Sequence, residues 1–113
     1  MNVVTFEVSS IEDVDRRARA AFAGEPQGAR VSFANAELLF SLLTPNRWRL
    51  LRAMAGSGPM SIREAARRVG RDVKAVHGDV HALIDAGVLK KDDKGLISFP
   101  FDAIHVDVLV KAA

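Results

Sequence analysis

The chain of 113 residues contains no cysteine, which excludes disulfide bonds, thiolate chemistry and cysteine-ligated zinc sites. It also lacks any stretch of the roughly 18 apolar residues that a membrane-spanning helix needs. Residues 1–10 contain no lysine or arginine, so we expect no secretory signal at this end. These absences together predict a cytoplasmic protein that does not enter a membrane.

Signatures of catalysis are also missing. The sequence has no glycine-rich phosphate-binding loop, no nucleophile elbow and no cysteine–histidine pair. Asp92 and Asp93 are adjacent in a predicted turn, so they do not form the separated pair of carboxylates that general acid–base catalysis uses. We therefore predict that the protein is not an enzyme and needs no cofactor.

Positive charge is concentrated in the middle of the chain, although the net charge of the whole sequence is only +2. Residues 45–95 contain eleven lysines or arginines and six acids, whereas the segments on either side are slightly negative. A basic segment of this kind indicates a polyanionic partner such as double-stranded DNA. The alternative explanation is an ordinary solvated surface.

The first 43 residues have patterns typical of packing and carry no recognisable chemistry. They predict strands at 3–8 and 31–33 and helices at 11–22 and 34–43. We expect this N-terminal β-α extension to form a dimer or partner surface, and we predict a homodimer. The strand at 3–8 and alternating valines near the C-terminus are predicted to share one sheet, within one chain or between two.

Residues 44–99 have the pattern of three helices followed by a β-hairpin. The predicted elements are helices at 45–55, 61–69 and 72–86, and a hairpin around the turn at 92–95. This order is typical of a winged helix-turn-helix. The remaining residues, 100–113, contain a predicted strand at 104–111. The predicted fold class is therefore α+β: a winged helix-turn-helix with an N-terminal β-α extension and a C-terminal strand.

Local signals mark the ends of these helices. Thr44 is a good N-cap, and Pro45 follows it at the first helical position, where a missing N–H costs nothing. Ser61 and Glu64 have the spacing of a capping box. Gly70 is expected to end the second helix, which leaves a short turn before the third.

In a helix-turn-helix the last helix enters the major groove, and flanking groups hold phosphates. We expect the apolar face of the helix at 72–86 to be buried, which leaves its opposite face for DNA. Small side chains at Ala75 and Gly78 would let that helix approach the groove floor closely. The candidate DNA-contacting residues are Ser61, Arg63, Arg67, Arg68, Arg71, Lys74, Ala75, His77, Gly78, His81, Lys90, Lys91 and Lys94.

Several of these candidates have simpler explanations. Arg67, Arg68 and the three hairpin lysines are equally well explained as solvating side chains. His77 and His81 have the i, i+4 spacing of two metal ligands on one helix, but His105 is the only other histidine. The glutamate of a zinc-protease helix is also absent beside them. We therefore predict no metal site.

Three segments carry a family resemblance: Leu43 to Arg47, Pro59 to Arg68, and Gly70 to Val80. Around them, residues 44–105 resemble a family of prokaryotic winged-helix DNA-binding regulators of the MarR type. The resemblance implies transcriptional regulation, with the third helix of the unit reading the DNA. Some members of that family look like antitoxins encoded beside small toxins, which implies a cognate toxin as a further partner.

The sequence thus predicts a sequence-specific DNA-binding regulator that acts as a dimeric repressor. One form of this role is the antitoxin and autorepressor of a toxin–antitoxin module. The alternative is a protein-binding winged helix, either an assembly subunit or a toxin-neutralising partner, with little or no DNA binding.

Overall fold

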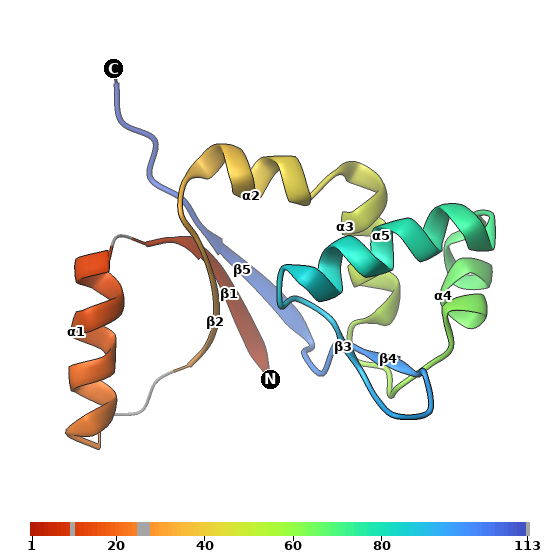
Figure 1. Ribbon diagram of the computed structural model, residues 1–113, viewed down its shortest axis with the longest axis horizontal. Coiled ribbons are helices and arrows are strands. Elements are labelled where there is room, and N and C mark those ends of the chain that lie inside the picture. Colours follow the sequence, from red (N-terminus) through yellow and green to blue (C-terminus); the bar gives the residue numbers. More distant parts are fainter. Residues whose placement is uncertain (10, 25–27, 113) are drawn as a thin grey trace.

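The computed structural model describes residues 1–9, 11–24 and 28–112, and for residues 11–14 and 17 it describes the backbone alone. These residues form an α+β fold with five helices, a three-stranded sheet and a two-stranded hairpin (Figure 1). In chain order the elements are β1 (Val3–Val8), α1 (Ile11–Phe22), β2 (Ala29–Phe33), α2 (Ala36–Leu42), α3 (Pro45–Met54), α4 (Ile62–Val69), α5 (Val73–Asp85), β3 (Lys90–Lys91), β4 (Ile97–Ser98) and β5 (Ala103–Asp107). None of these helices is both long and apolar enough to cross a lipid bilayer.

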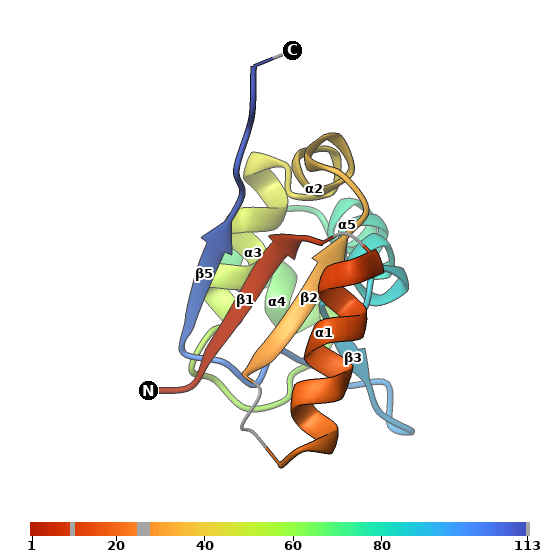
Figure 2. The same ribbon diagram turned by 90° about the vertical axis from the view of Figure 1, so that its left-hand side faces the viewer.

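A parallel sheet joins the two ends of the chain. β1 is the central strand, with β2 on one side and β5 on the other. α1 lies in front of one face of this sheet, and the other helices lie behind the opposite face (Figure 2). The predicted pairing of the terminal strands therefore occurs within one chain. Because both edges of β1 are occupied, this strand is not available to pair with a second copy.

The face of the sheet that is turned away from α1 contributes to the hydrophobic core. Val4 and Phe6 are almost completely buried there. The Phe6 ring contacts those of Trp48 and Phe33, with ring centroids 6.2 and 6.5 Å apart. The same core continues through the helices and the hairpin, where its members include Leu39, Leu50, Leu51, Met54, Ala65, Val76, Val80, Leu83, Ile97 and Phe99. Residues 1–43 and 44–99 thus share one core, against which the start of β5 also packs.

α2 is shorter than predicted and the hairpin has a short ladder, because local hydrogen bonds intervene. α2 begins at Ala36, since Asn35 caps it by accepting a hydrogen bond from the Leu38 N–H at 2.9 Å. The hairpin ladder begins at Lys90, because the N–H groups of residues 88 and 89 bond back to the Leu83 carbonyl at 2.9 and 3.2 Å. Those bonds close the end of α5 and are therefore lost to the hairpin.

The other differences concern the sheet and α1. β2 begins two residues earlier than predicted, because it pairs with β1 from Ala29 onward. β5 ends at Asp107, four residues earlier than predicted, opposite Glu7, which is the last residue of β1 that pairs with it. α1 has its predicted bounds, but Phe22 at its end is 97 % exposed and does not join the core.

Candidate nucleic-acid interface

A tight turn at 70–72 joins α4 to α5. Ser61 caps α4, and its Oγ accepts a hydrogen bond from the Glu64 N–H at 3.0 Å. Gly70 ends α4 in the left-handed conformation (φ 65°), which glycine adopts without a side-chain clash. Asp72 then caps α5 by accepting from the Lys74 N–H at 3.2 Å. The predicted helix ends are thus confirmed, and they place the two helices on either side of a three-residue turn.

A shallow groove of about 430 Å³ lies between the start of α4 and the turn into α5. Its lining residues are Ser61, Arg63, Glu64, Ala66, Arg67, Arg71 and Val73. Four of the thirteen candidates therefore share one concave surface, although the sequence separates them by up to ten positions. Three guanidinium groups beside the N-terminus of a helix favour an anionic ligand such as phosphate.

Glu64 offsets part of this positive charge. Its carboxylate accepts hydrogen bonds from Arg67 at 2.6 and 2.8 Å and from Arg68 at 3.0 Å. The bonds from Arg67, and then those from Arg68, lower the pKa of Glu64 from 4.5 to about 2. The carboxylate faces these arginines instead of turning back to Ser61, so only half of the predicted capping box forms. Arg68 also donates to the Ser57 Oγ at 2.9 Å, which connects α4 to the end of α3.

Asp79 in α5 forms ion pairs with two arginines from other segments. Its oxygens lie 3.0 Å from the Arg47 Nε and 2.6 Å from the Arg71 Nη1, and each of the three side chains is at most 25 % exposed. Arg47 also donates to the Leu42 carbonyl at 2.9 Å. The cluster thus ties α3 and the α4–α5 turn to α5. The Asp79 carboxylate therefore engages one side of the Arg71 guanidinium.

The outer face of α5 is exposed along the positions that the sequence indicates. Val76, Val80 and Leu83 are buried, whereas Lys74, Ala75, His77 and Gly78 are exposed and His81 is half-buried. A Cβ atom added at Gly78 would meet no other atom within 4 Å. Lys74 has no ion pair with any residue that the structure describes, and the same holds for Arg63 on α4. These two cations are therefore available to an external anion.

The hairpin presents Lys90, Lys91 and Lys94 to solvent at the end of the molecule that also carries α4 and α5 (Figure 1). Its turn depends on Asp92, whose Oδ1 accepts from the N–H groups of Lys94 and Leu96, both at 2.9 Å. Its base is joined to the start of α4 by paired backbone bonds between residues 60 and 97, at 2.8 and 2.9 Å. The hairpin lysines therefore keep a fixed relation to the groove.

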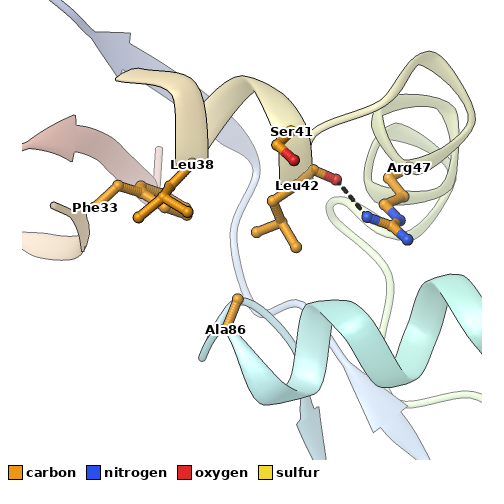
Figure 3. Close-up of a pocket in the computed structure, with 6 residues that line it drawn as sticks. All are labelled: Phe33, Leu38, Ser41, Leu42, Arg47 and Ala86. Atoms are coloured by element: carbon orange, nitrogen blue, oxygen red, sulfur yellow. Dashed lines mark hydrogen bonds between the residues drawn. The ribbon is translucent and has the colours of Figure 1, made fainter. Parts of the chain in front are cut away.

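A second hollow, of about 370 Å³, is mainly apolar and lies between the end of β2, α2 and the end of α5 (Figure 3). It is lined by Phe33, Leu38, Ser41, Leu42, Arg47 and Ala86. Figure 3 shows the Arg47 side chain at one end of it, held by the Leu42 carbonyl. Leu38 and the neighbouring Phe40 are both more than half exposed. Sequence patterns gave no indication of this hollow, because its walls come from four elements: β2, α2, α3 and the end of α5.

The sequence did not lead us to predict a buried carboxylate on the sheet. Glu7 in β1 is only 6 % exposed, and the Arg30 Nη1 donates to it at 2.6 Å. The hydroxyl groups of Ser9 and Ser32 lie 3.0 and 3.3 Å from its other oxygen. The available signal was strand alternation, since Val4 and Phe6 on the core face place Glu7 on the opposite face. These hydrogen bonds explain how a carboxylate can be buried on the sheet, so Glu7 has a structural role.

Comparison with known proteins gives one family. The family model described as HVO_A0114 matches residues 42–106, which is more than half of the chain and includes α3, α4, α5 and the hairpin. No curated protein matches the sequence. Within the described residues, no three histidine, aspartate or glutamate side chains gather closely enough to hold a metal ion.

Proposed function

The chain belongs to the HVO_A0114 family, and we propose that its segment from α3 to β4 is a winged helix-turn-helix that binds double-stranded DNA. The observation that carries this proposal is the outer face of α5. That face is exposed and has small side chains at Ala75 and Gly78, while the opposite face is buried in the core. It is flanked by Lys74 and Arg63, neither of which has an ion pair with a described residue. A helix with these properties is suited to lie along the floor of a major groove.

In this arrangement each element has a separate task. α5 reads base edges through Lys74, His77 and His81, because the major groove distinguishes all four base pairs. The groove at the start of α4 holds a backbone phosphate through the Ser61 end of the helix and Arg63. The hairpin lysines contact the backbone beside the site. The protein then acts as a dimeric repressor with no catalytic step, and repression of its own operator beside a toxin gene is one form of this role.

The first test is binding to a labelled duplex from the protein's own upstream region, measured by fluorescence anisotropy across a salt series. Wild type is compared with the double variant Arg63→Ala/Lys74→Ala. We expect the variant to bind at least tenfold more weakly, because it loses both a base contact and a phosphate contact. Its log–log salt slope should be shallower by about 1, since the lost phosphate contact of Arg63 removes about one unit.

The matched control is Arg19→Ala/Lys111→Ala, which removes the same charge from exposed positions in α1 and the C-terminal segment. This control is expected to bind like wild type, because both positions lie at the other end of the molecule (Figure 1). Equal losses in the two double variants would mean that binding depends on net charge alone. The proposal that α4 and α5 contact the DNA would then be wrong.

Gly78→Ala should separate folding from DNA binding. Because Gly78 is exposed within α5 and nothing lies near the added methyl group, the free energy of unfolding should rise by about 0.5–1 kcal/mol. DNA affinity should fall, since the methyl group enters the space that the groove floor would occupy. Urea unfolding and anisotropy measure the two effects. Increased stability with unchanged affinity would contradict a close approach of α5 to DNA at this position.

The second candidate function is a winged helix that binds a protein, either an assembly partner or a toxin. The observation that favours it is the apolar hollow in Figure 3, beside which Leu38 and Phe40 expose large side chains. The pairing of Arg67, Arg68 and Arg71 with internal carboxylates also reduces the charge available for DNA. No binding in the anisotropy experiment, or weak binding that is equal for wild type and the double variant and for any duplex, would favour this second candidate.

A further inference from the structure

His77 and His81 lie one turn apart on the outer face of α5, and their Nε2 atoms are 3.1 Å from one another. The ring centroids are 4.2 Å apart and the ring planes are inclined by 43°. The rings therefore converge at their Nε2 edges. The i, i+4 spacing permits this approach but does not require it, because each side chain has more than one staggered rotamer.

We propose that the His77–His81 pair binds a divalent transition-metal ion through its two Nε2 atoms. Imidazole nitrogens coordinate zinc at about 2.0–2.1 Å. Two nitrogens that are 3.1 Å apart and both at that distance from one ion subtend an angle of about 98° at the ion. This value lies between octahedral and tetrahedral angles, so the separation of the two nitrogens is compatible with a single ion that contacts both.

The protons of the two rings can also be placed. Without an ion, one Nε2–H donates to the lone pair of the other Nε2, as the 3.1 Å separation requires. Metal coordination needs both lone pairs, so the donor ring moves its proton to Nδ1 and stays neutral. Neither Nδ1 atom has a hydrogen-bond partner among the described residues, and the change therefore breaks no other contact.

The ligands select the class of ion. Imidazole nitrogens favour zinc, copper and nickel, whereas magnesium and calcium prefer oxygen ligands. No third histidine, aspartate or glutamate joins the pair within the described residues. Water must complete the coordination of an ion at this exposed position. If α5 faces DNA as proposed above, a phosphate oxygen can replace one of these coordinating waters. Only this consequence rests on the proposed function.

The test is a calorimetric titration of the full chain, stripped of metal with a chelator, with zinc chloride. His77→Ala and His81→Ala are measured beside wild type, and His105→Ala, an exposed histidine in β5, is the matched control. We expect each helix variant to lose at least about tenfold in zinc affinity, because loss of even an outer-shell partner of a metal ligand has effects of 10–100-fold. His105→Ala should bind zinc like wild type, and magnesium should give no heat.

Thermal unfolding provides a second readout, since an ion bound only to the folded state raises the melting temperature. Zinc should raise it for wild type and His105→Ala, but not for the two helix variants. Equal zinc affinity in wild type and both helix variants, or no binding to wild type, would overturn the proposal. Zinc binding by a protein that does not bind DNA would leave the metal site standing and refute the proposed function instead.

Discussion

The variant Phe6→Ala should lower the free energy of unfolding by about 3–5 kcal/mol, the usual range for removing a buried aromatic ring. Phe6 is completely buried in the central strand, where its ring contacts Trp48 and Phe33. The substitution leaves a cavity at the junction between the sheet and the helices. For a domain whose total stability is about 5–15 kcal/mol, the loss is large. Urea unfolding followed by circular dichroism measures it.

The chain offers a matched control in Phe22→Ala. Phe22 is 97 % exposed at the end of α1, so the same chemical change there should alter stability by no more than about 0.5 kcal/mol. A loss in Phe22→Ala as large as that in Phe6→Ala would contradict the arrangement of the sheet. Such a result would place Phe22, and with it the end of α1, in a core.

The second large effect is expected for Asp79→Ala, which should destabilise the fold by about 2–3 kcal/mol, because hydrogen bonds to charged groups contribute 1.5–3 kcal/mol. The Asp79 carboxylate holds Arg47 and Arg71, and both guanidinium groups are largely covered. Its removal leaves two neighbouring positive charges without their shared counter-ion. The orientation of α5 against α3 and the turn should then loosen. Urea unfolding again provides the measurement.

Asp85→Ala is the control for this prediction. Asp85 ends the same helix but is exposed, and no ion pair joins it to a described residue. Its replacement should change stability by no more than about 0.5 kcal/mol. If the two aspartate variants were equally stable, the Arg47–Asp79–Arg71 cluster would contribute nothing to the fold.

The position of β1 at the centre of the sheet means that deletion of residues 1–9 would affect folding as well as the assembly of subunits. A strand near the start of a chain invites the interpretation that it lies at an edge, where its removal would affect only the assembly of subunits. Both edges of β1 are instead paired, with Val4 and Phe6 in the core. Deletion of residues 1–9 would therefore remove the centre of the sheet. Among the described strands of this sheet, the outer edges of β2 and β5 remain available to a partner.

Features set by neighbouring residues could be derived from the sequence. The caps at Thr44, Ser61 and Asp72 and the left-handed Gly70 depend on hydrogen bonds over two to four positions, so a short window contains all the information. The buried face of α5 followed from apolar spacing in the same way. The candidate cations could also be named from the sequence, because the residue type alone shows that a side chain is charged.

Only the tertiary structure decided which of those cations have partners. Arg71 is engaged by Asp79, which also binds an arginine 32 positions away, whereas Lys74 and Arg63 have no ion pair with a described residue. The parallel order β2-β1-β5, the ion pair of Glu7 with Arg30 and the 3.1 Å approach of His77 to His81 also lay beyond the sequence. Hydrogen bonds within a turn are determined by neighbouring residues. Contacts between residues that are distant in the sequence, and the rotamers of their side chains, depend instead on how the whole core packs.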